Sequence, residues 1–239
     1  MNQNVIDIHP YGDSALLVNF EQRIAPEINA RVLDLDEAID SAGLPGIAFR
    51  IPAYCSLTVG YDPMVVPFET LREQIAALAR SVATAGEQRP SRKLKIPACY
   101  EEPYALDIED VSRQTGLSRQ EIIDLHTGTK FRVYMLGFLP GFAYMGRLQE
   151  VLACSRKATP RVRVPAQSVG LAGFQTGIYP SEAPGGWQII GRTPLRVFDG
   201  AKEDPFFFRP GDEVAFEAIS AKEFEGMENA CPTQRGGEN

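Results

Sequence analysis

One segment, residues 164–194, restricts the possible folds more than any other part of the chain. It reads VPAQSVGLAGFQTGIYPSEAPGGWQIIGRTP and holds six glycines, four prolines and the only tryptophan, Trp187. Glycine and proline are poor helix formers, so we do not expect this region to be helical. Disordered linkers share this richness in glycine and proline, but they lack large apolar side chains at such density. The segment therefore predicts a packed region of short strands and tight turns.

The C-terminal half of the chain follows the same pattern. Apolar runs separated by glycine and proline predict four strand regions, within residues 130–138, 160–165, 187–198 and 212–219. Short strands at such spacing are typical of a closed β structure. Ahead of them, residues 94–100 predict another strand. Residues 106–128 predict two short helices that meet at Gly116, and Ser118 with Glu121 forms a capping box for the second helix.

The first 88 residues predict a separate α+β unit. Strands are expected at residues 13–20 and twice within 46–63, and helices at residues 25–43 and 67–86. Helices that alternate with strands suited to antiparallel pairing suggest a ferredoxin-like arrangement. The polar segment 87–93, which contains Pro90, is the best candidate for a linker. We therefore expect three parts: residues 1–88 as the N-terminal domain, 93–225 as a β-barrel domain and 226–239 as a flexible tail.

Composition and charge narrow the class of partner. The net charge is −7 over 239 residues, which disfavours nucleic acid or an anionic membrane as a general partner. No apolar run approaches the roughly 20 residues needed to span a bilayer. The start of the chain lacks the basic flank and apolar stretch of a secretory signal, and the four cysteines lie far apart. These features predict a cytoplasmic protein with reduced cysteines.

Familiar catalytic motifs are weak in this chain. Ser168 lies in AQSVG, which approximates the GxSxG nucleophile elbow, but no helix is expected after it and both histidines precede it. A hydrolase triad is therefore disfavoured, and the Ser168 hydroxyl is better interpreted as bonding locally or to a ligand. Two isolated histidines and scattered cysteines offer no zinc-ligand spacing, so no metal is expected. Neither GxxxxGK[ST] nor GxGxxG occurs.

Three groups of residues have both a structural and a functional interpretation. His126 ends a predicted helix, where it is either structural or a catalytic group with a pKa near its ordinary value of about 6.5. Arg161 and Arg163 share one face of a predicted strand, either as a solvated face or as a site for carboxylate or phosphate. Arg156 and Lys157 make this the most basic stretch of the chain.

The third group is aromatic. Residues 137–146, GFLPGFAYMG, set Phe138, Phe142 and Tyr144 among three glycines and a proline. Core aromatics around a turn would explain this pattern, and so would a rigid, aromatic-lined wall. Glycine permits close approach of backbone or ligand, and proline limits the entropy lost on binding. Together with residues 164–194, the segment suggests a preformed pocket or a partner surface.

Several blocks resemble one known family. Residues 137–145, 156–173, 175–194 and 209–216 are similar to signature blocks of the Kip-inhibitor/allophanate-hydrolase-subunit-1 family. The resemblance covers almost the whole chain, and it implies a small N-terminal α+β domain followed by a cyclophilin-like β-barrel. The chain departs from the family pattern at Gln167, where glycine is usual, and at Ala143, where proline is common.

The resemblance also implies a function. Stand-alone bacterial members belong to an ATP-dependent 5-oxoprolinase, which hydrolyses 5-oxoproline to glutamate. The expected partners are a homologous second cyclophilin-like subunit, of the C type, and a third subunit of the A type. ATP is the expected cofactor, bound mainly by those partners. Two alternatives stay open: inhibition of a sensor histidine kinase, and a carboxyltransferase-type role in a urea- or allophanate-utilising complex.

An unstrained lactam is a poor electrophile, so ATP-dependent opening needs hydrogen-bond donors around the developing oxyanion and phosphate. On this basis the catalytic candidates are His126, Arg161 and Ser168. The candidates for substrate binding are Phe138, Pro140, Gly141, Phe142, Tyr144, Arg163, Gln167, Gly173, Gln175, Tyr179, Gly185, Gly186, Trp187 and Arg192. The chain is expected to supply one wall of a shared site and to be inactive alone.

Overall fold

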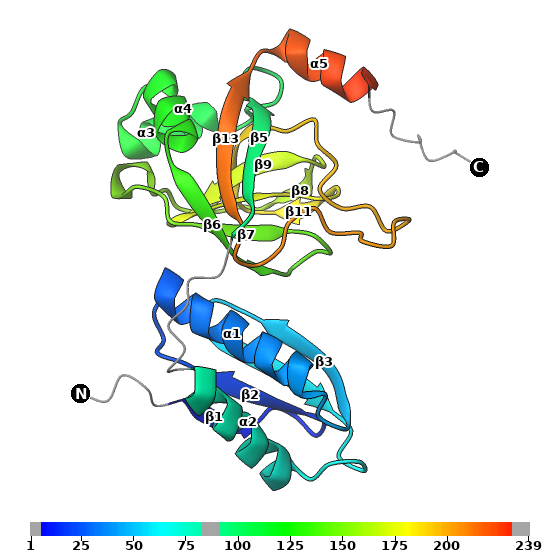
Figure 1. Ribbon diagram of the computed structural model, residues 1–239. Helices are drawn as coiled ribbons and strands as arrows, with labels where there is room; N and C mark the ends of the chain where they lie inside the picture. Colours follow the sequence, from blue (N-terminus) through cyan, green and yellow to red (C-terminus); the bar gives the residue numbers. More distant parts are fainter. Residues whose placement is uncertain (1–5, 83–90, 231–239) are drawn as a thin grey trace. The chain divides into compact units, whose positions relative to one another are not determined.

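A computed structural model describes residues 6–82 and 91–230. The chain divides into two compact units, residues 1–91 and 92–239, each with its own hydrophobic core (Figure 1). Most of the predicted linker, and the last nine residues of the predicted tail, lie outside the described residues.

The N-terminal unit is one antiparallel four-stranded sheet with two helices. Its elements are β1 (Asp7–Pro10), β2 (Ala15–Asn19), α1 (Pro26–Ala42), β3 (Ile47–Pro52), β4 (Ser56–Tyr61) and α2 (Phe68–Val82). The sheet order is β1-β2-β4-β3. A ferredoxin-like domain has the chain order βαββαβ, whereas this unit has ββαββα. The ferredoxin-like arrangement is therefore not confirmed, because β1 and β2 follow each other without a helix between them and, among the described residues, no strand of this sheet follows α2.

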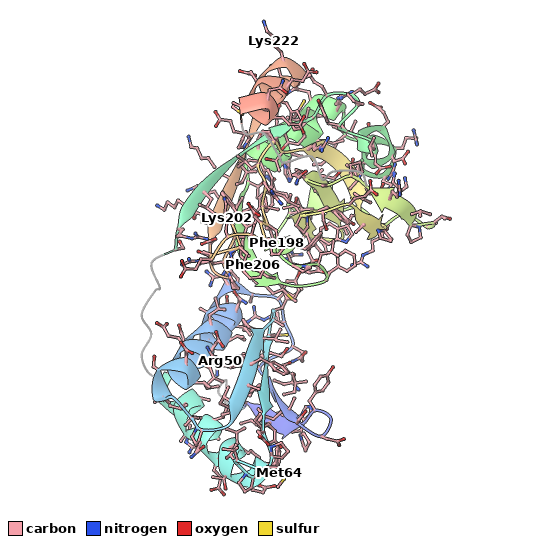
Figure 2. The ribbon with its side chains drawn as sticks, turned by 90° about the vertical axis from the view of Figure 1, so that its right-hand side faces the viewer. Arg50, Met64, Phe198, Lys202, Phe206 and Lys222 are labelled. Atoms are coloured by element: carbon pink, nitrogen blue, oxygen red, sulfur yellow. The ribbon has the colours of Figure 1, made fainter. Side chains whose placement is uncertain are left out.

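The helices of this unit cover one face of the sheet. Leu16 and Val18 of β2 alternate inward with Leu57 and Val59 of β4, as a half-buried sheet requires. They pack against apolar residues of both helices in the same cluster: Ile28, Val32, Leu35, Ile39, Leu71 and Ile75. The apolar residues at helical spacing in the two predicted helices thus face the core. The guanidinium of Arg50 in β3 (Figure 2) also donates hydrogen bonds to two carboxylates of α1, to Asp36 at 2.9 Å and to Asp40 at 2.6 Å.

The C-terminal unit is built on a closed seven-stranded barrel, consistent with the predicted cyclophilin-like domain. Its strands are β5 (Lys93–Cys99), β6 (Lys130–Leu136), β7 (Ala143–Gly146), β9 (Ser168–Ala172), β10 (Gln175–Ile178), β12 (Gln188–Arg192) and β13 (Glu213–Ile219). They follow the order β10-β7-β6-β13-β5-β12-β9, and β10 also pairs with β9 to close the barrel. The pair β5 and β13, side by side in Figure 1, is parallel, whereas the other pairs in the barrel are antiparallel.

Side chains fill the barrel. The main apolar cluster includes Ile96, Phe131, Met145, Val169 and Phe216, which come from five different strands. Helices α3 (Ile108–Thr115) and α4 (Arg119–Thr127) add Val111 and Ile122 to it. The predicted capping box of α4 is confirmed, with both of its hydrogen bonds present. A filled barrel leaves functional chemistry to its outer surface and loops.

Two features of this unit were not predicted. Strand β8 (Arg161–Val164) lies in the predicted strand region 160–165, but it pairs with β11 (Ala183–Gly185) in a separate two-stranded sheet outside the barrel. Helix α5 (Ala221–Ala230) occupies the start of the predicted flexible tail, which is a correction for residues 226–230. Ser220 and Glu223 form reciprocal hydrogen bonds at its start, so a capping box in the sequence marks where this helix begins. Phe224 is fully buried and its ring lies 4.3 Å from that of Tyr104.

Candidate functional site

The aromatic residues of the glycine-rich segments form a second core rather than an open wall. Phe142, Tyr179 and Trp187 are buried, at no more than 5% exposed. The Phe142 ring meets the other two edge to face, at centroid distances of 5.2 and 5.3 Å. Tyr144 borders the cluster and is only half-buried, with its ring 5.8 Å from Trp187. These residues therefore pack as part of a buried cluster, and none of them lines the polar hollow described below.

The loop that joins β6 to β7 contributes Phe142 to this core, whereas Phe138 of the same loop is exposed, with its ring centroid 5.7 Å from that of Phe142. Phe138 is 61% exposed and has a φ of 66°, and Gly141 has a φ of 84°. With Pro140 and Phe206 they border a shallow apolar hollow of about 360 Å³. Figure 2 shows Phe206 beside Phe198, and their ring centroids lie 5.4 Å apart. The predicted aromatic segment therefore divides between a buried core and an exposed loop.

His126, one of the predicted catalytic residues, is fully buried in the barrel unit. Its Nδ1 lies 2.7 Å from the Tyr100 hydroxyl and its Nε2 lies 2.9 Å from Thr176 Oγ1. Thr176 donates its hydrogen to the Gly170 carbonyl oxygen, so the Thr176 oxygen accepts from Nε2–H and His126 Nδ1 accepts from Tyr100. Burial lowers the pKa of His126 to about 3. The ring is thus a neutral structural link between α4 and the barrel.

Ser168 is also buried, at 1% exposed, where it begins β9. Its backbone carbonyl accepts a hydrogen bond from the Tyr179 N–H at 2.9 Å. A hydroxyl in this position is closed to a substrate arriving from solvent. The segment around it runs through the barrel wall as β9, and the catalytic role of Ser168 stays a prediction.

Arg161, the third catalytic candidate, belongs to an ion cluster. It donates two hydrogen bonds to the carboxylate of Asp107, which is 1% exposed, at 2.5 and 2.7 Å. Lys157 Nζ lies 2.7 Å from Asp107 and 3.0 Å from Asp110. Burial alone would raise the pKa of Asp107, but Arg161, Lys157 and the Ile189 N–H together hold it below its ordinary value. Arg161 is therefore committed to an internal carboxylate that joins β8 to the start of α3.

A polar hollow of about 410 Å³ lies beside this cluster. Its lining includes Asp110, Arg113 and Gln114 from α3, Arg156 and Lys157 from the segment before β8, and Gln188 from β12. The guanidinium of Arg156 lies over the Trp187 ring, 5.9 Å from its centroid. The aromatic core thus forms a platform under the Arg156 side chain. This hollow therefore brings together two features that the sequence analysis singled out. They are the basic stretch with Arg156 and Lys157, and the glycine-rich segment with Trp187.

The remaining predicted residues lie elsewhere on the unit. Arg163 is exposed and pairs with Glu182 at 3.3 Å. Arg192 donates to the Ala166 carbonyl at 2.8 Å and lies over the Phe224 ring. Gln167 has a φ of 62°, which explains why a glycine suits this position.

The last four predicted residues, three glycines and Gln175, lie in turns, in strands or against other side chains. Gly173 has a φ of 58° in the turn from β9 to β10, and Gln175 is the first residue of β10. The carbonyl of Gly186 accepts the Lys157 N–H at 2.7 Å. Gly185 lies against Tyr179. None of the four lines the polar hollow.

Sequence reasoning missed the other charged and amide side chains of the hollow, which are Asp110, Arg113, Gln114 and Gln188. Arg113 and Gln114 lie on a helix predicted without a role, and Gln188 follows Trp187 directly in a predicted strand. Only the three-dimensional fold brings α3 and β12 to the basic stretch.

The described residues offer neither a metal cluster nor a membrane-spanning helix. Within residues 6–82 and 91–230, no group of three or more His, Cys, Asp or Glu side chains could hold a metal ion. Over those same residues, no helix has the length and apolar character needed to cross a membrane.

Comparisons with known proteins identify the family. The carboxyltransferase domain family, subdomains C and D, matches residues 6–208. The chain is 39% identical to the 5-oxoprolinase B subunit of Bacillus subtilis over 91% of this chain and 94% of that one. It is 36% identical to the 5-oxoprolinase B subunit of Escherichia coli O157:H7 over 86% of this chain and 92% of that one.

Longer proteins contain regions similar to this chain. The crystal structure of TTHA0988 matches with a TM-score of 0.76 and 36% identity, over 87% of this chain but only 40% of that protein. A putative urea carboxylase of Emericella nidulans is 24% identical, and the chain spans 21% of its length. The filled barrel, the signature blocks and these matches lead to one conclusion: the chain belongs to the Kip-inhibitor/allophanate-hydrolase-subunit-1 family of carboxyltransferase-type domains.

Proposed function

We propose that this chain is one subunit of an ATP-dependent 5-oxoprolinase that hydrolyses 5-oxoproline to glutamate. The observation that carries the proposal is the similarity to proteins named as the B subunit of 5-oxoprolinase, at 36–39% identity over nearly the full length of both chains. Similarity of this extent includes both units of the chain, so it is not limited to the barrel.

The chemistry of the described residues supports a shared site. Two of the predicted catalytic side chains, His126 and Ser168, are buried, and Arg161 is paired with Asp107. The accessible polar groups in the hollow are suited to binding and orienting a substrate. Phosphorylation of the lactam oxygen and attack by water therefore depend on groups and ATP that partner subunits supply. The expected partners are a second cyclophilin-like subunit of the C type and a third subunit of the A type.

A second candidate function is a carboxyltransferase-type role in a urea-utilising complex. The family match and the urea carboxylase relative favour it. It ranks lower because that relative is less similar and the chain corresponds to only a fifth of its length.

The experiment is purification of the tagged full-length chain from its native cells, with identification of the chains that accompany it. The complex should hydrolyse ATP in the presence of 5-oxoproline, and the isolated chain should not. Reconstitution without this chain should abolish the turnover. Biotin-dependent carboxylation of urea without 5-oxoproline turnover would instead establish the second function.

A further inference from the structure

We propose that the polar hollow beside α3 binds a doubly charged phosphate group, with Arg113, Arg156 and Lys157 as the cations that hold it. The hollow is lined by α3, by the segment before β8 and by β12. The binding of phosphate is argued from the side chains alone, whereas its place in a reaction rests on the proposed function. In the proposed complex, the phosphate belongs either to a nucleotide on a partner subunit or to the phosphorylated lactam.

Positive charge exceeds negative charge in the lining of the hollow. Among the described residues, the three cations line it together with one carboxylate, that of Asp110. The nearby Asp107 carboxylate is 1% exposed and forms a two-bond pair with Arg161, so this pair adds no net charge. The lining thus has two more cations than carboxylates, in a chain whose net charge is −7. A phosphate group carries about 1.5 to 2 negative charges at neutral pH and matches this excess, whereas a monocarboxylate neutralises only part of it.

Two of the cations lie close together because they share one carboxylate. Lys157 Nζ lies 3.0 Å from Asp110 Oδ2, and the Arg113 guanidinium contacts Oδ1 of the same group. Lys157 also donates to Asp107, so one of its three N–H donors stays available, and Arg113 keeps four of its five. Asp110 therefore places two positive charges with available donors side by side at the hollow.

Arg156 supplies the third cation. Among the described residues it has no ion pair, and its guanidinium lies 5.9 Å from the centroid of the buried Trp187 ring. A guanidinium over a ring keeps its N–H donors for anions, and its fork of donors matches the oxygens of phosphate. Arg156 directly precedes Lys157 in the chain, and both line the hollow.

The amide groups of the lining also favour a ligand that only accepts hydrogen bonds. Gln114 Oε1 accepts the Ser155 N–H at 3.0 Å, which fixes the orientation of this amide. The Gln114 NH₂ group has no partner among the described residues and is a further donor. Both oxygens of Asp110 already accept from the cations beside them, and Gln188 Oε1 is enclosed in the wall. A phosphate dianion has acceptors only, so it suits a lining with these donors.

The test is calorimetric binding of inorganic phosphate to the isolated full-length chain. The wild type should bind phosphate with a dissociation constant of about 1 mM or lower, and acetate should bind at least about tenfold more weakly. Arg156→Gln and Arg113→Gln should each weaken phosphate binding by about tenfold, because each removes a charge-assisted contact. Both side chains are exposed, so both variants should fold.

Arg147→Gln is the matched control. Arg147 is also an exposed arginine over an aromatic ring, 4.2 Å from the centroid of Phe174, but it lies outside the hollow. This variant should bind phosphate like the wild type. Equal weakening in Arg147→Gln and Arg156→Gln would show a response to overall charge alone and would overturn the site. Acetate that binds as tightly as phosphate, or a wild type that does not bind phosphate, would overturn it as well.

Kinetics of the reconstituted complex distinguish the two sources of the phosphate. If the hollow holds a phosphate of the nucleotide, Arg156→Gln should raise the KM for ATP by about tenfold and leave the KM for 5-oxoproline unchanged. If it holds the phosphate transferred to the lactam, the variant should lower kcat by about tenfold and leave the KM for ATP unchanged. Unchanged values of all three constants would overturn the role of the hollow in this reaction.

Failure of the site and failure of the proposed function give different results, because phosphate binding is measured on the isolated chain without turnover. A complex that turns over 5-oxoproline, built with a chain that does not bind phosphate, would refute the site and leave the proposed function intact. A chain that binds phosphate through Arg113 and Arg156, in a complex without turnover, would refute the function and leave the site.

Discussion

A β-carbon on Gly185 would lie 2.2 Å from the hydroxyl oxygen of Tyr179, whereas one on the neighbouring Gly186 would meet nothing closer than 3.7 Å. The two glycines of the PGGW segment therefore have different reasons to be present. Gly185 allows Tyr179 to fill the aromatic core beneath Arg156, and Gly186 is free of this restriction.

Substitution by alanine should separate these glycines. Gly185→Ala should lower the free energy of unfolding by about 2 kcal/mol, because the buried Tyr179 ring must shift. Gly186→Ala should change it by no more than about 0.5 kcal/mol. Urea unfolding of both variants measures the difference. Similar losses for the two variants would mean that Tyr179 does not restrict Gly185.

The two arginines of β8 should also behave differently. Arg161→Ala should lower the free energy of unfolding by about 2–3 kcal/mol, because it leaves the buried Asp107 carboxylate short of two hydrogen bonds. Arg163→Ala breaks only an exposed pair with Glu182 and should cost at most about 1 kcal/mol. Thermal unfolding of the two variants provides the measurement. If Arg161→Ala left the stability unchanged but impaired activity, the role of Arg161 would be catalytic and not structural.

Gln167 should be replaceable by glycine with a gain in stability. A non-glycine residue at positive φ is strained, so Gln167→Gly should raise the free energy of unfolding by about 0.5–1 kcal/mol after the entropy of glycine is counted. Gln167→Val should lower it by about 1–2 kcal/mol, because a β-branched side chain tolerates this conformation poorly. Denaturant midpoints of the three proteins should rank glycine, glutamine, valine. A destabilised glycine variant would show that the bond from Gln167 to Pro180 outweighs the strain.

His126 should make the protein sensitive to acid. An unfolded histidine takes up a proton near pH 6.5, whereas buried His126 has its pKa lowered to about 3 and stays neutral. The unfolded state therefore binds more protons as the pH falls below about 6.5, and stability is lost in that direction until the folded pKa is reached. Between pH 7 and pH 5 this contribution amounts to about 2 kcal/mol.

The measurement is urea unfolding at both pH values for the wild type and for His126→Gln. The variant should be less stable at pH 7 but should lack this part of the pH dependence. Tyr100→Phe should also destabilise, by about 1–2 kcal/mol, since it leaves His126 Nδ1 without its donor. Equal pH dependence in the wild type and His126→Gln would contradict the buried neutral assignment.

Helix α5 should be an integral part of the barrel unit. Phe224→Ala removes a fully buried ring that contacts Tyr104 and Arg192, and it should cost about 3–4 kcal/mol. Met227→Ala, on the exposed side of the same helix, should be nearly neutral. Thermal unfolding of the isolated full chain compares them. A small effect of Phe224→Ala would mean that the helix is peripheral after all.

Local patterns were reliable where a single element decides the structure. The apolar spacing of Ile28, Val32, Leu35 and Ile39 predicted α1, and the Ser118 capping box placed the start of α4. The short edge strand β1 escaped prediction because four residues with a proline carry little periodic signal. Strands β9 and β10 also escaped prediction, because they are short, contain glycine and are buried along nearly their whole length, so they carry no alternation of buried and exposed residues.

The candidate site was harder to predict because its meaning depends on partners distant in the chain. From the sequence, Arg161 could bind a carboxylate or phosphate ligand. In the structure its guanidinium pairs with Asp107, which lies 54 residues away in the chain. The sequence placed His126 at the end of a helix, but it could not show that the Tyr100 and Thr176 hydroxyls bond to both of its ring nitrogens. Conversely, Gln188 follows Trp187 in a predicted strand, but its sequence context does not indicate that it lies beside Arg156 and Lys157 at the polar hollow.

The parallel pairing of β5 with β13 has a consequence for biosynthesis. These strands are the first and last of the barrel in chain order, and every residue of β13 from Glu213 to Ile219 has a partner on β5. The ribosome must therefore synthesise the chain through Ile219 before the barrel can close. Until then the edges of β5 and its neighbours are unpaired and can pair incorrectly. A nonsense mutation upstream of Glu213 should yield an aggregating product rather than a shorter working barrel.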